Sequence, residues 1–434
     1  MLEVIGEKLS GVRQVLRVRM LESSPLLVLF TTTATAGLIV GLATGAPLVR
    51  RELVRIDRPG WAGETAFAGQ GVLYVAERVD LPAVYSAGGS KPTRIYETPA
   101  VPLPPRIKRQ TAYESRVVQD LVSLDGSSVM AAFVRRVTVA QSPKCWPQCR
   151  LPGRGVRLFT EVRVRLGAGP FRRLAGGPGR CPSGQFWPDE VAVAGDHVVY
   201  SGRLDGCKGR RQESRIVVAS VRGGKPVREV IAHFPPAPFT HVAAAGRFLA
   251  WTRDQGELPN SDLRNPRLVV YDRLRRRVDY RLKLPKRLRV KTILSLDVQS
   301  DGKAAAQIER EGGRCSIPQI IWSAPSARPL LHFIPGRSFA GTSTKVKLAR
   351  DRLMFVWAGG RGCADYRASD LVVKSLNGAV VRVLGHYDVR TRPVSYPGFS
   401  FDFDGTRSAF AESVDLDPGN ANRGWTSIYV DDLR

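Results

Sequence analysis

The sequence predicts an all-β fold, a seven-bladed β-propeller, on the basis of a repeat, its spacing and its residue pattern. One phrase recurs seven times: an alternating strand, a tight polar turn and a second apolar strand. The turns lie near Gln70, Asp125, Gly195, Ala245, Asp301, Arg350 and Asp404, giving steps of 55, 70, 50, 56, 49 and 54 residues. After Pro47, apolar residues alternate with period two between frequent Gly and Pro, which is typical of strands. A strand-only repeat of this length indicates propeller blades.

Each blade is expected to be a four-stranded antiparallel meander, lettered A to D from the axis outward. Blade three shows it most plainly, with strands expected at 190–194, 197–202, 215–221 and 227–233. The last blade reaches Arg434 at the end of its strand C and lacks strand D. The segment 47–57 belongs to no other blade, so we expect it to supply that outer strand. Closing the ring in this way removes two exposed sheet edges.

Two segments exceed the repeat. Residues 97–115 contain four prolines and are expected to be a stiff, extended connector between blades one and two. Residues 141–155, which include Cys145, Trp146 and Cys149, are expected to be an insertion between strands B and C of blade two.

The repeat resembles that of the TolB-like propellers, which are built from the WD40-like repeat. Its nearest echoes are Asp404-Gly405 followed by Ala409-Phe410, and the strand from Ile428 to Asp431. Asp125-Gly126 and Asp301-Gly302 keep the turn of that motif, whereas three other blades depart from it. The resemblance covers residues 47–434 and implies the propeller fold. Proteins of this kind serve as scaffolds, enzyme gates and receptors, so the resemblance names no single function.

The N-terminus contains one long uncharged stretch, residues 25–46. At about 1.5 Å per residue it is just long enough to cross a bilayer as a helix. Arg13, Arg17 and Arg19 precede it, which favours a cytoplasmic amphipathic basic tail at residues 1–24. We expect residues 25–46 to be a transmembrane anchor or a cleaved signal peptide, the latter being conventional if the chain starts at Met20. The propeller, residues 47–434, would then be extracytoplasmic, either membrane-anchored or secreted.

Six cysteines lie among Gly, Pro and charged residues rather than within apolar strands, which fits export and disulfides. All six fall in B–C loops or D-to-A crossovers, which emerge on the same face of a propeller. We expect three bridges: Cys145–Cys149, Cys181–Cys207 and Cys315–Cys363. Zinc is the rival interpretation, but the spacing matches no common ligand pattern and no histidine is near.

The net charge of +27 points to anionic partners. The densest basic run follows Asp272 and ends at Lys291. Within it, Asp279, Arg281 and Lys283 alternate with apolar residues, so the basic groups are expected to line one face of an outer strand. Outer strands are often simply solvated, which is the plainer interpretation of the run itself. Envelope polymers, acidic polysaccharide and lipid headgroups fit the charge, whereas export argues against nucleic acid as the native partner.

The sequence offers little sign of catalysis. No G-x-S-x-G motif occurs, and the five histidines show no metal-ligand spacing, so each is expected to be a structural strand residue. An acidic loop from Asp415 to Asn422 lacks the pattern of an EF-hand. We therefore assign no catalytic residue, metal or cofactor.

The most consistent interpretation is a non-enzymatic extracytoplasmic scaffold that binds a protein or an anionic partner through its B–C face. Candidate contacts on that face are Trp146, Arg203, Arg314, Arg361 and Tyr366. The alternative is a propeller enzyme acting on an envelope polysaccharide or peptide, with Asp205, Glu311 and Asp365 near the channel mouth. A third hypothesis is a membrane-tethered assembly factor that finds its partner through the N-terminal helix.

Overall fold

A computed structural model describes the chain from Val49 to Leu433. Within that range it leaves out short segments: 58–60, 78–80, 89–90, 109–112, 144–153, 179–184, 206–211, 222–225, 237–239, 254–265, 312–315, 335–336, 339–344, 359–367, 389–393 and 417–422.

The first three blades follow one another along the chain. Blade 1 consists of β2 (Trp61–Ala68), β3 (Gly71–Glu77), β4 (Pro82–Ala87) and β5 (Thr93–Glu97). A single helical turn, α3 (Pro105–Lys108), precedes blade 2, which consists of β6 (Tyr113–Gly126), β7 (Met130–Pro143), β8 (Arg154–Leu166) and β9 (Arg172–Gly176). Blade 3 consists of β10 (Gln185–Ala194), β11 (His197–Asp205), β12 (Glu213–Ser220) and β13 (Val227–Phe234).

The next blades repeat the arrangement with small variations. Blade 4 consists of β14 (Val242–Ala245), β15 (Phe248–Arg253), β16 (Arg267–Asp272) and β17 (Arg277–Lys283), followed by the 3₁₀ helix η1 (Lys286–Leu288). Blade 5 consists of β18 (Val290–Val298), β19 (Ala304–Glu311), β20 (Ser316–Ser323) and β21 (His332–Phe333). In blade 6 the innermost strand is split into β22 (Arg337–Ser338) and β23 (Lys347–Ala349), and β24 (Arg352–Ala358), β25 (Ala368–Ser375) and β26 (Val380–Asp388) follow.

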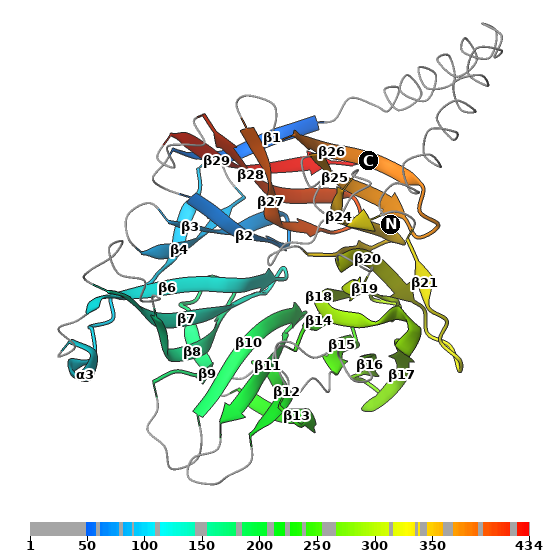
Figure 1. Cartoon of the computed structure of the whole chain (residues 1–434), viewed down its shortest axis with the longest axis horizontal. Coiled ribbons are helices and arrows are strands. Elements are labelled where there is room, and N and C mark those ends of the chain that lie inside the picture. The colour runs from blue at the N-terminus through cyan, green and yellow to red at the C-terminus, as the bar shows by residue number, and fades with distance from the viewer. Residues whose placement is uncertain are drawn as a thin grey trace, which may run out of the picture. The chain divides into compact units, whose positions relative to one another are not determined.

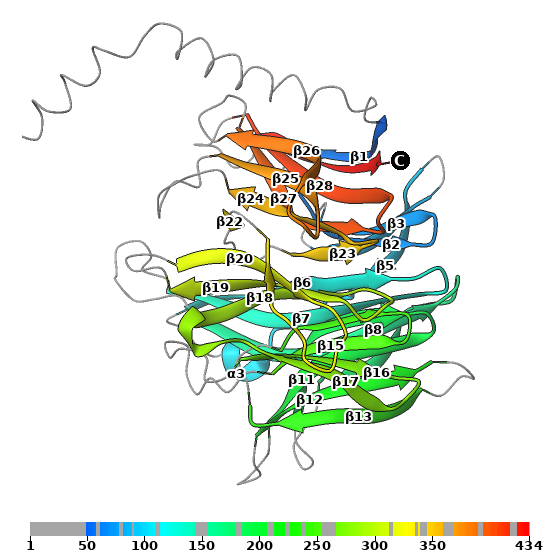
Figure 2. The same ribbon diagram turned by 90° about the vertical axis from the view of Figure 1, so that its right-hand side faces the viewer.

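Blade 7 is completed from the other end of the described chain. It contains β27 (Val394–Phe403), β28 (Arg407–Asp415) and β29 (Gly424–Asp432), and β1 (Val49–Asp57) pairs with β29 as its outer strand. The seven sheets surround one axis, and from the side their strands run roughly along it (Figures 1 and 2). The prediction of seven blades is therefore confirmed, and so is closure of the ring by the described part of the segment 47–57, which is β1.

Arg50 fastens the closing strand. Its guanidinium lies 3.0 Å from the Oδ2 of Asp431, donates to the carbonyl of Leu384, and sits over the rings of Phe410 and Tyr429 at 5.1 and 5.3 Å. One side chain thus ties β1 to β29, β28 and blade 6. Such contacts matter because an unfastened edge strand exposes unpaired backbone groups.

Apolar residues pack between neighbouring blades and form the core. Leu121 and Phe133 of blade 2, for example, join Ala66, Leu73 and Val75 of blade 1 in one buried cluster. The period-two alternation explains this, because successive side chains of a strand point to opposite faces of its sheet and so reach both neighbouring blades.

The connector at 97–115 is not wholly extended, contrary to the prediction from the sequence, since residues 105–108 form α3 and β6 begins at Tyr113. Pro105 fits the first turn of a helix because it lacks the N–H that this position leaves unused.

Residues 1–24 and 25–46 lie outside the described range, and within that range no helix is long and apolar enough to cross a membrane.

Candidate functional site

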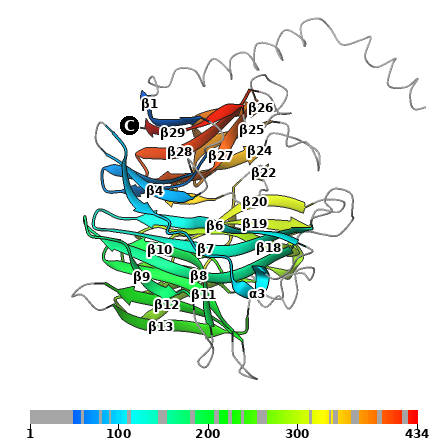
Figure 3. The same cartoon turned by 90° about the vertical axis from the view of Figure 1, so that its left-hand side faces the viewer.

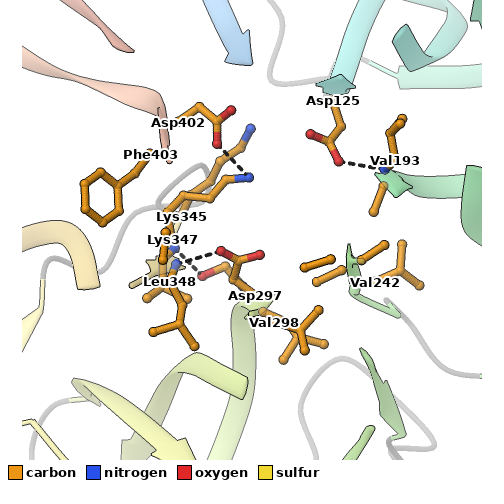
Figure 4. Close-up of a pocket in the computed structure, with 18 of the residues that line it drawn as sticks. Asp125, Val193, Val242, Asp297, Val298, Lys345, Lys347, Leu348, Asp402 and Phe403 are labelled. Carbon is orange, nitrogen blue, oxygen red and sulfur yellow. Dashed lines mark hydrogen bonds and ion pairs between the residues drawn. The ribbon is translucent and has the colours of Figure 1, made fainter. Parts of the chain in front are cut away.

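The central channel is the first candidate site. The innermost strands of six blades line a cavity of about 400 Å³, a size typical of ligand pockets. Asp125, Asp297 and Asp402 enter it from three different blades, and Lys345 and Lys347 lie between the last two (Figure 4).

Each of these aspartates follows a serine by two residues, and together they clamp one blade to the next. The serine Oγ accepts a hydrogen bond from a backbone N–H of the neighbouring innermost strand, and the aspartate Oδ2 accepts from the N–H two residues further on. The bonds are Ser123–Val191 (2.9 Å) and Asp125–Val193 (2.7 Å), Ser295–Val346 (3.0 Å) and Asp297–Leu348 (2.7 Å), and Ser400–Thr65 (2.8 Å) and Asp402–Phe67 (2.7 Å). We call this pair the Ser-x-Asp clamp. It joins blade 2 to 3, 5 to 6, and 7 to 1.

Lys347 is the cation at the centre of these carboxylates. Its Nζ lies 3.0 Å from Asp402 Oδ1. Burial alone would lower its pKa, but Asp402, Asp297 and Asp125 hold the pKa well above the ordinary value. Burial raises the pKa of Asp297 to about 6, although Lys347 partly opposes the rise. Burial likewise raises the pKa of Asp125.

A second polar chain links blades 3, 4 and 5. Glu190 Oε2 accepts from the backbone N–H of Val242 at 2.9 Å and lies 3.2 Å from Nδ1 of His241. His241 Nε2 in turn donates to the carbonyl of Ile293 at 2.8 Å. Burial alone would lower the pKa of His241, but Glu190 and the Ile293 carbonyl outweigh it and raise the pKa. His241 therefore has the structural role that the sequence suggested.

These groups give the channel a mechanical role. The three Asp side chains, Glu190 and His241 each bond to a neighbouring blade, and Lys345 pairs with Glu64 from blade 1. No three His, Cys, Asp or Glu residues in the described part of the chain converge closely enough to hold a metal ion.

Of the five candidate contacts on the B–C face, one can be placed. Arg203 lies near the end of β11, and its Nε is 2.9 Å from Asp205 Oδ1. Trp146, Arg314, Arg361 and Tyr366 lie outside the described residues. So do Cys145, Cys149, Cys181, Cys207, Cys315 and Cys363, and the three bridges remain predictions that intact mass before and after reduction would test.

Arg203 belongs to a cluster that the sequence did not suggest. Asp189 sits among Arg157, Arg203 and Arg136, and burial raises its pKa to about 6 although all three arginines lower it. Arg157 also lies over the ring of Trp187 at 5.6 Å. The cluster sits between blades 2 and 3, at the end from which the B–C loops emerge.

Two of the three acids proposed for an enzymatic channel mouth are engaged in ion pairs. Asp205 pairs with Arg203, and Glu311 Oε2 lies 2.5 Å from Arg289 Nε. Asp365 lies outside the described residues.

The basic residues in the run of blade 4 are mostly exposed, although Asp279 shares their face of β17. In β17, Tyr280 and Leu282 are buried in the core while Arg281 and Lys283 face solvent, as the alternation predicted. We define the basic band as the exposed cationic residues of this run: Arg275, Arg276, Arg277, Arg281, Lys283, Lys286, Arg287, Arg289 and Lys291. Within the described structure, Arg277, Arg281, Lys283, Lys286 and Arg287 form no ion pair.

Sequence reasoning missed the channel residues, although a signal was present. The triplets Ser-Leu-Asp, Ser-Leu-Asp and Ser-Phe-Asp occur at 123–125, 295–297 and 400–402, each on an innermost strand. Serine and aspartate disfavour strand interiors, so their recurrence at the same position of three blades indicates a shared use.

Comparison with known proteins supports no assignment beyond the fold. No known protein family matches the chain, so membership of the TolB-like family is not shown. No curated protein matches it by sequence either.

Several solved propeller proteins are similar in structure at low identity. The propeller domain of the trilobed protease from Pyrococcus furiosus is 9% identical with a TM-score of 0.45, the match covering 86% of this chain and 98% of that one. An acylaminoacyl peptidase is 9% identical with a TM-score of 0.47, covering 86% and 52%. A polysaccharide lyase is 8% identical with a TM-score of 0.47, covering 91% and 95%. The chain spans about half the length of the peptidases it resembles, such as a prolyl endopeptidase of which 48% is covered.

Proposed function

We propose that this propeller is a non-enzymatic binding or scaffold protein of the cell envelope that holds anionic partners, either polymers or acidic proteins. In this proposal residues 25–46 tether or export the chain, and the ring displays a fixed surface outside the cytoplasm. The observation that carries the proposal is the basic band, where five cationic side chains without ion pairs follow one another along the outer edge of blade 4.

The band suits an extended polyanion for electrostatic reasons. Alternate residues on one face of a strand lie about 7 Å apart, so Arg281 and Lys283 offer regularly spaced charges. Because these side chains form no ion pair within the described structure, their positive charge can attract an anionic partner, whereas an internal ion pair would neutralise it.

Retention of the full chain on an acidic polysaccharide matrix, measured against salt, tests this proposal. The variant Arg281→Gln, Lys283→Gln, Arg287→Gln should elute at clearly lower salt than the parent. The matched control changes three exposed basic residues elsewhere, Arg51, Lys91 and Arg172, to Gln and removes the same net charge. Equal losses in the two variants would contradict the proposal, because only net charge would then matter.

Two further experiments distinguish the proposed function from a tethered assembly factor and from a propeller enzyme. Removing residues 1–46 should leave polymer binding unchanged, whereas loss of partner capture on this deletion would favour the tethered assembly factor. Release of soluble fragments from the bound polymer or a peptide over time would favour the alternative, a propeller enzyme.

A further inference from the structure

Blade 2 differs from the other blades in the length of its strands. β6, β7 and β8 have 14, 14 and 13 residues, whereas the longest strands of the other blades have 10. Four additional residues extend a strand by about 13 Å. The Ser123 and Asp125 bonds align the A–B turn end of blade 2 with blade 3, so the additional length lies at the B–C end. The three long strands run side by side (Figure 3).

One face of this extension is covered. Arg135 is buried, pairs with Glu161 at 2.9 Å and donates to the carbonyl of Pro99 at 3.0 Å, while Gln119 donates to the same carbonyl at 3.1 Å. Pro99 belongs to the connector from blade 1. The covered face is therefore fastened by structural hydrogen bonds.

The opposite face has a depression that is open to solvent. Asp120, Arg136, Thr138, Ser142 and Arg157 are among the residues that line a cavity of about 590 Å³ there, and we call this set the blade 2 platform. Strand pairing brings its members together, because Asp120 lies opposite Arg136 and Thr138 lies opposite Arg157.

The two arginines of the platform have unused capacity. Neither Arg136 nor Arg157 forms an ion pair within the described structure, and the Nε of Arg136 is buried without a hydrogen-bond partner. Burial, and next Arg136, lower the pKa of Arg157, whereas Asp189, which sits among Arg136, Arg157 and Arg203, raises it. The guanidinium groups of Arg136 and Arg157 form no ion pair with Asp189, so a ligand carboxylate would give both of them a hydrogen-bond acceptor.

The other side chains of the blade 2 platform indicate which class of anion it could bind. Asp120 supplies an acceptor, and Thr138 and Ser142 supply hydroxyls that both donate and accept. A carboxylate at this position would repel a polyphosphate, which carries several charges, more strongly than a uronate, which carries one, and it can accept a hydrogen bond from a sugar hydroxyl. A peptide is disfavoured because peptides commonly add to a free sheet edge, whereas this cavity lies on a sheet face.

We propose that the blade 2 platform binds a uronate unit of an acidic polysaccharide, with Arg136 and Arg157 holding its carboxylate and Asp120, Thr138 and Ser142 its hydroxyls. This inference rests on the proposed function and gives it a ligand class. The basic band attracts the polymer by charge, and the platform selects the sugar acid.

Calorimetric titration of the full chain with trigalacturonate tests the proposal. Arg136→Gln and Arg157→Gln should each weaken binding at least ten-fold, whereas Lys91→Gln, which removes an exposed charge outside both the platform and the basic band, should leave the affinity for this short ligand unchanged. Thermal midpoints check that the variants are folded; because Arg157 is exposed, its variant remains informative if Arg136→Gln is unstable.

Control ligands define the outcomes that would overturn the proposal. The methyl ester of trigalacturonate and maltotriose lack the carboxylate and should bind at least ten-fold more weakly. Equal binding of the ester, equal binding of triglutamate, or full affinity in Arg157→Gln would each refute the uronate site. Absence of trigalacturonate binding alongside salt-dependent polymer retention through the basic band would refute this inference alone and leave the proposed function standing. Loss of both would refute the two together.

Discussion

Replacement of Lys347 by methionine tests whether the channel charges hold the ring together. The side chain is 22% exposed and its Nζ lies 3.0 Å from Asp402, whose side chain is 11% exposed. Removing one partner of a buried ion pair costs about 3–5 kcal/mol, because the other charge is left uncompensated. Asp402 keeps the hydrogen bond from the N–H of Phe67, so we expect the lower end of that range, about 3 kcal/mol near pH 8.

The dependence of this penalty on pH is diagnostic. Lys347 lowers the pKa of Asp297, which is about 6 in the intact protein, so Asp297 should titrate above 6 in the variant. At about pH 5 Asp297 is then largely neutral, fewer carboxylates repel one another, and the difference in stability between parent and variant should shrink. Urea unfolding of both proteins at the two pH values measures this difference.

The matched control is Lys303→Met, which removes a lysine about as exposed as Lys347, 2.8 Å from Asp351 and 2.9 Å from Asp301. The side chains of these two partners are 56% and 44% exposed, against 11% for Asp402. Surface pairs of this kind contribute up to about 1 kcal/mol. A loss in Lys347→Met no larger than in this control, or a penalty that stays constant between the two pH values, would refute the electrostatic account of the channel.

Three other changes probe the ring. Arg50→Ala should lower the unfolding midpoint and hasten proteolysis near β1, because the ion pair with Asp431 is lost; unchanged proteolysis would contradict closure by this contact. Asp297→Asn should stabilise the protein near pH 8 by at most about 3 kcal/mol and little near pH 4. The pKa of Asp297 is about 6 in the folded protein and exceeds its value in the unfolded chain, so the parent protein loses stability as the pH rises through this range. Equal effects of the substitution at both pH values would contradict this explanation. Gly405→Ala should cost about 1–2 kcal/mol in chemical unfolding, because φ is +94° and a Cβ would lie 2.7 Å from Arg350 Cγ; no loss would show that the turn relaxes.

The fold could be predicted from sequence because a propeller repeats its local rules. The turn near Asp404 shows why a short motif is enough. Its carboxylate accepts from the backbone N–H groups of Thr406 and Arg407 at 2.9 and 2.7 Å, and Gly405 supplies the positive φ that the turn needs. The role of residues 47–57 in closing the ring could also be predicted, because the strands expected from the repeat left blade seven without its outer strand. The helical turn α3 was missed because four residues carry no periodic signal.

The site was less predictable, since its residues come together only in the folded ring. Asp125, Asp297 and Asp402 are separated by more than a hundred residues from one another along the chain, and nothing local shows that one lysine lies among them. Arg203 was selected because its loop register placed it on the B–C face. Its neighbours Arg136 and Arg157 belong to another blade and were not considered.

These contacts indicate that the residues that join the blades differ from the residues of the blade 2 platform. Where a strand carries a Ser-x-Asp clamp, its serine and aspartate are hydrogen-bonded to the next blade. Blade 2 has its clamp at the turn end, at Ser123 and Asp125, and its additional length at the other end. The residues of the platform are thus free of the clamp, so they could acquire arginines and hydroxyls without cost to closure. This separation explains how one blade can carry specificity while the ring around it stays rigid.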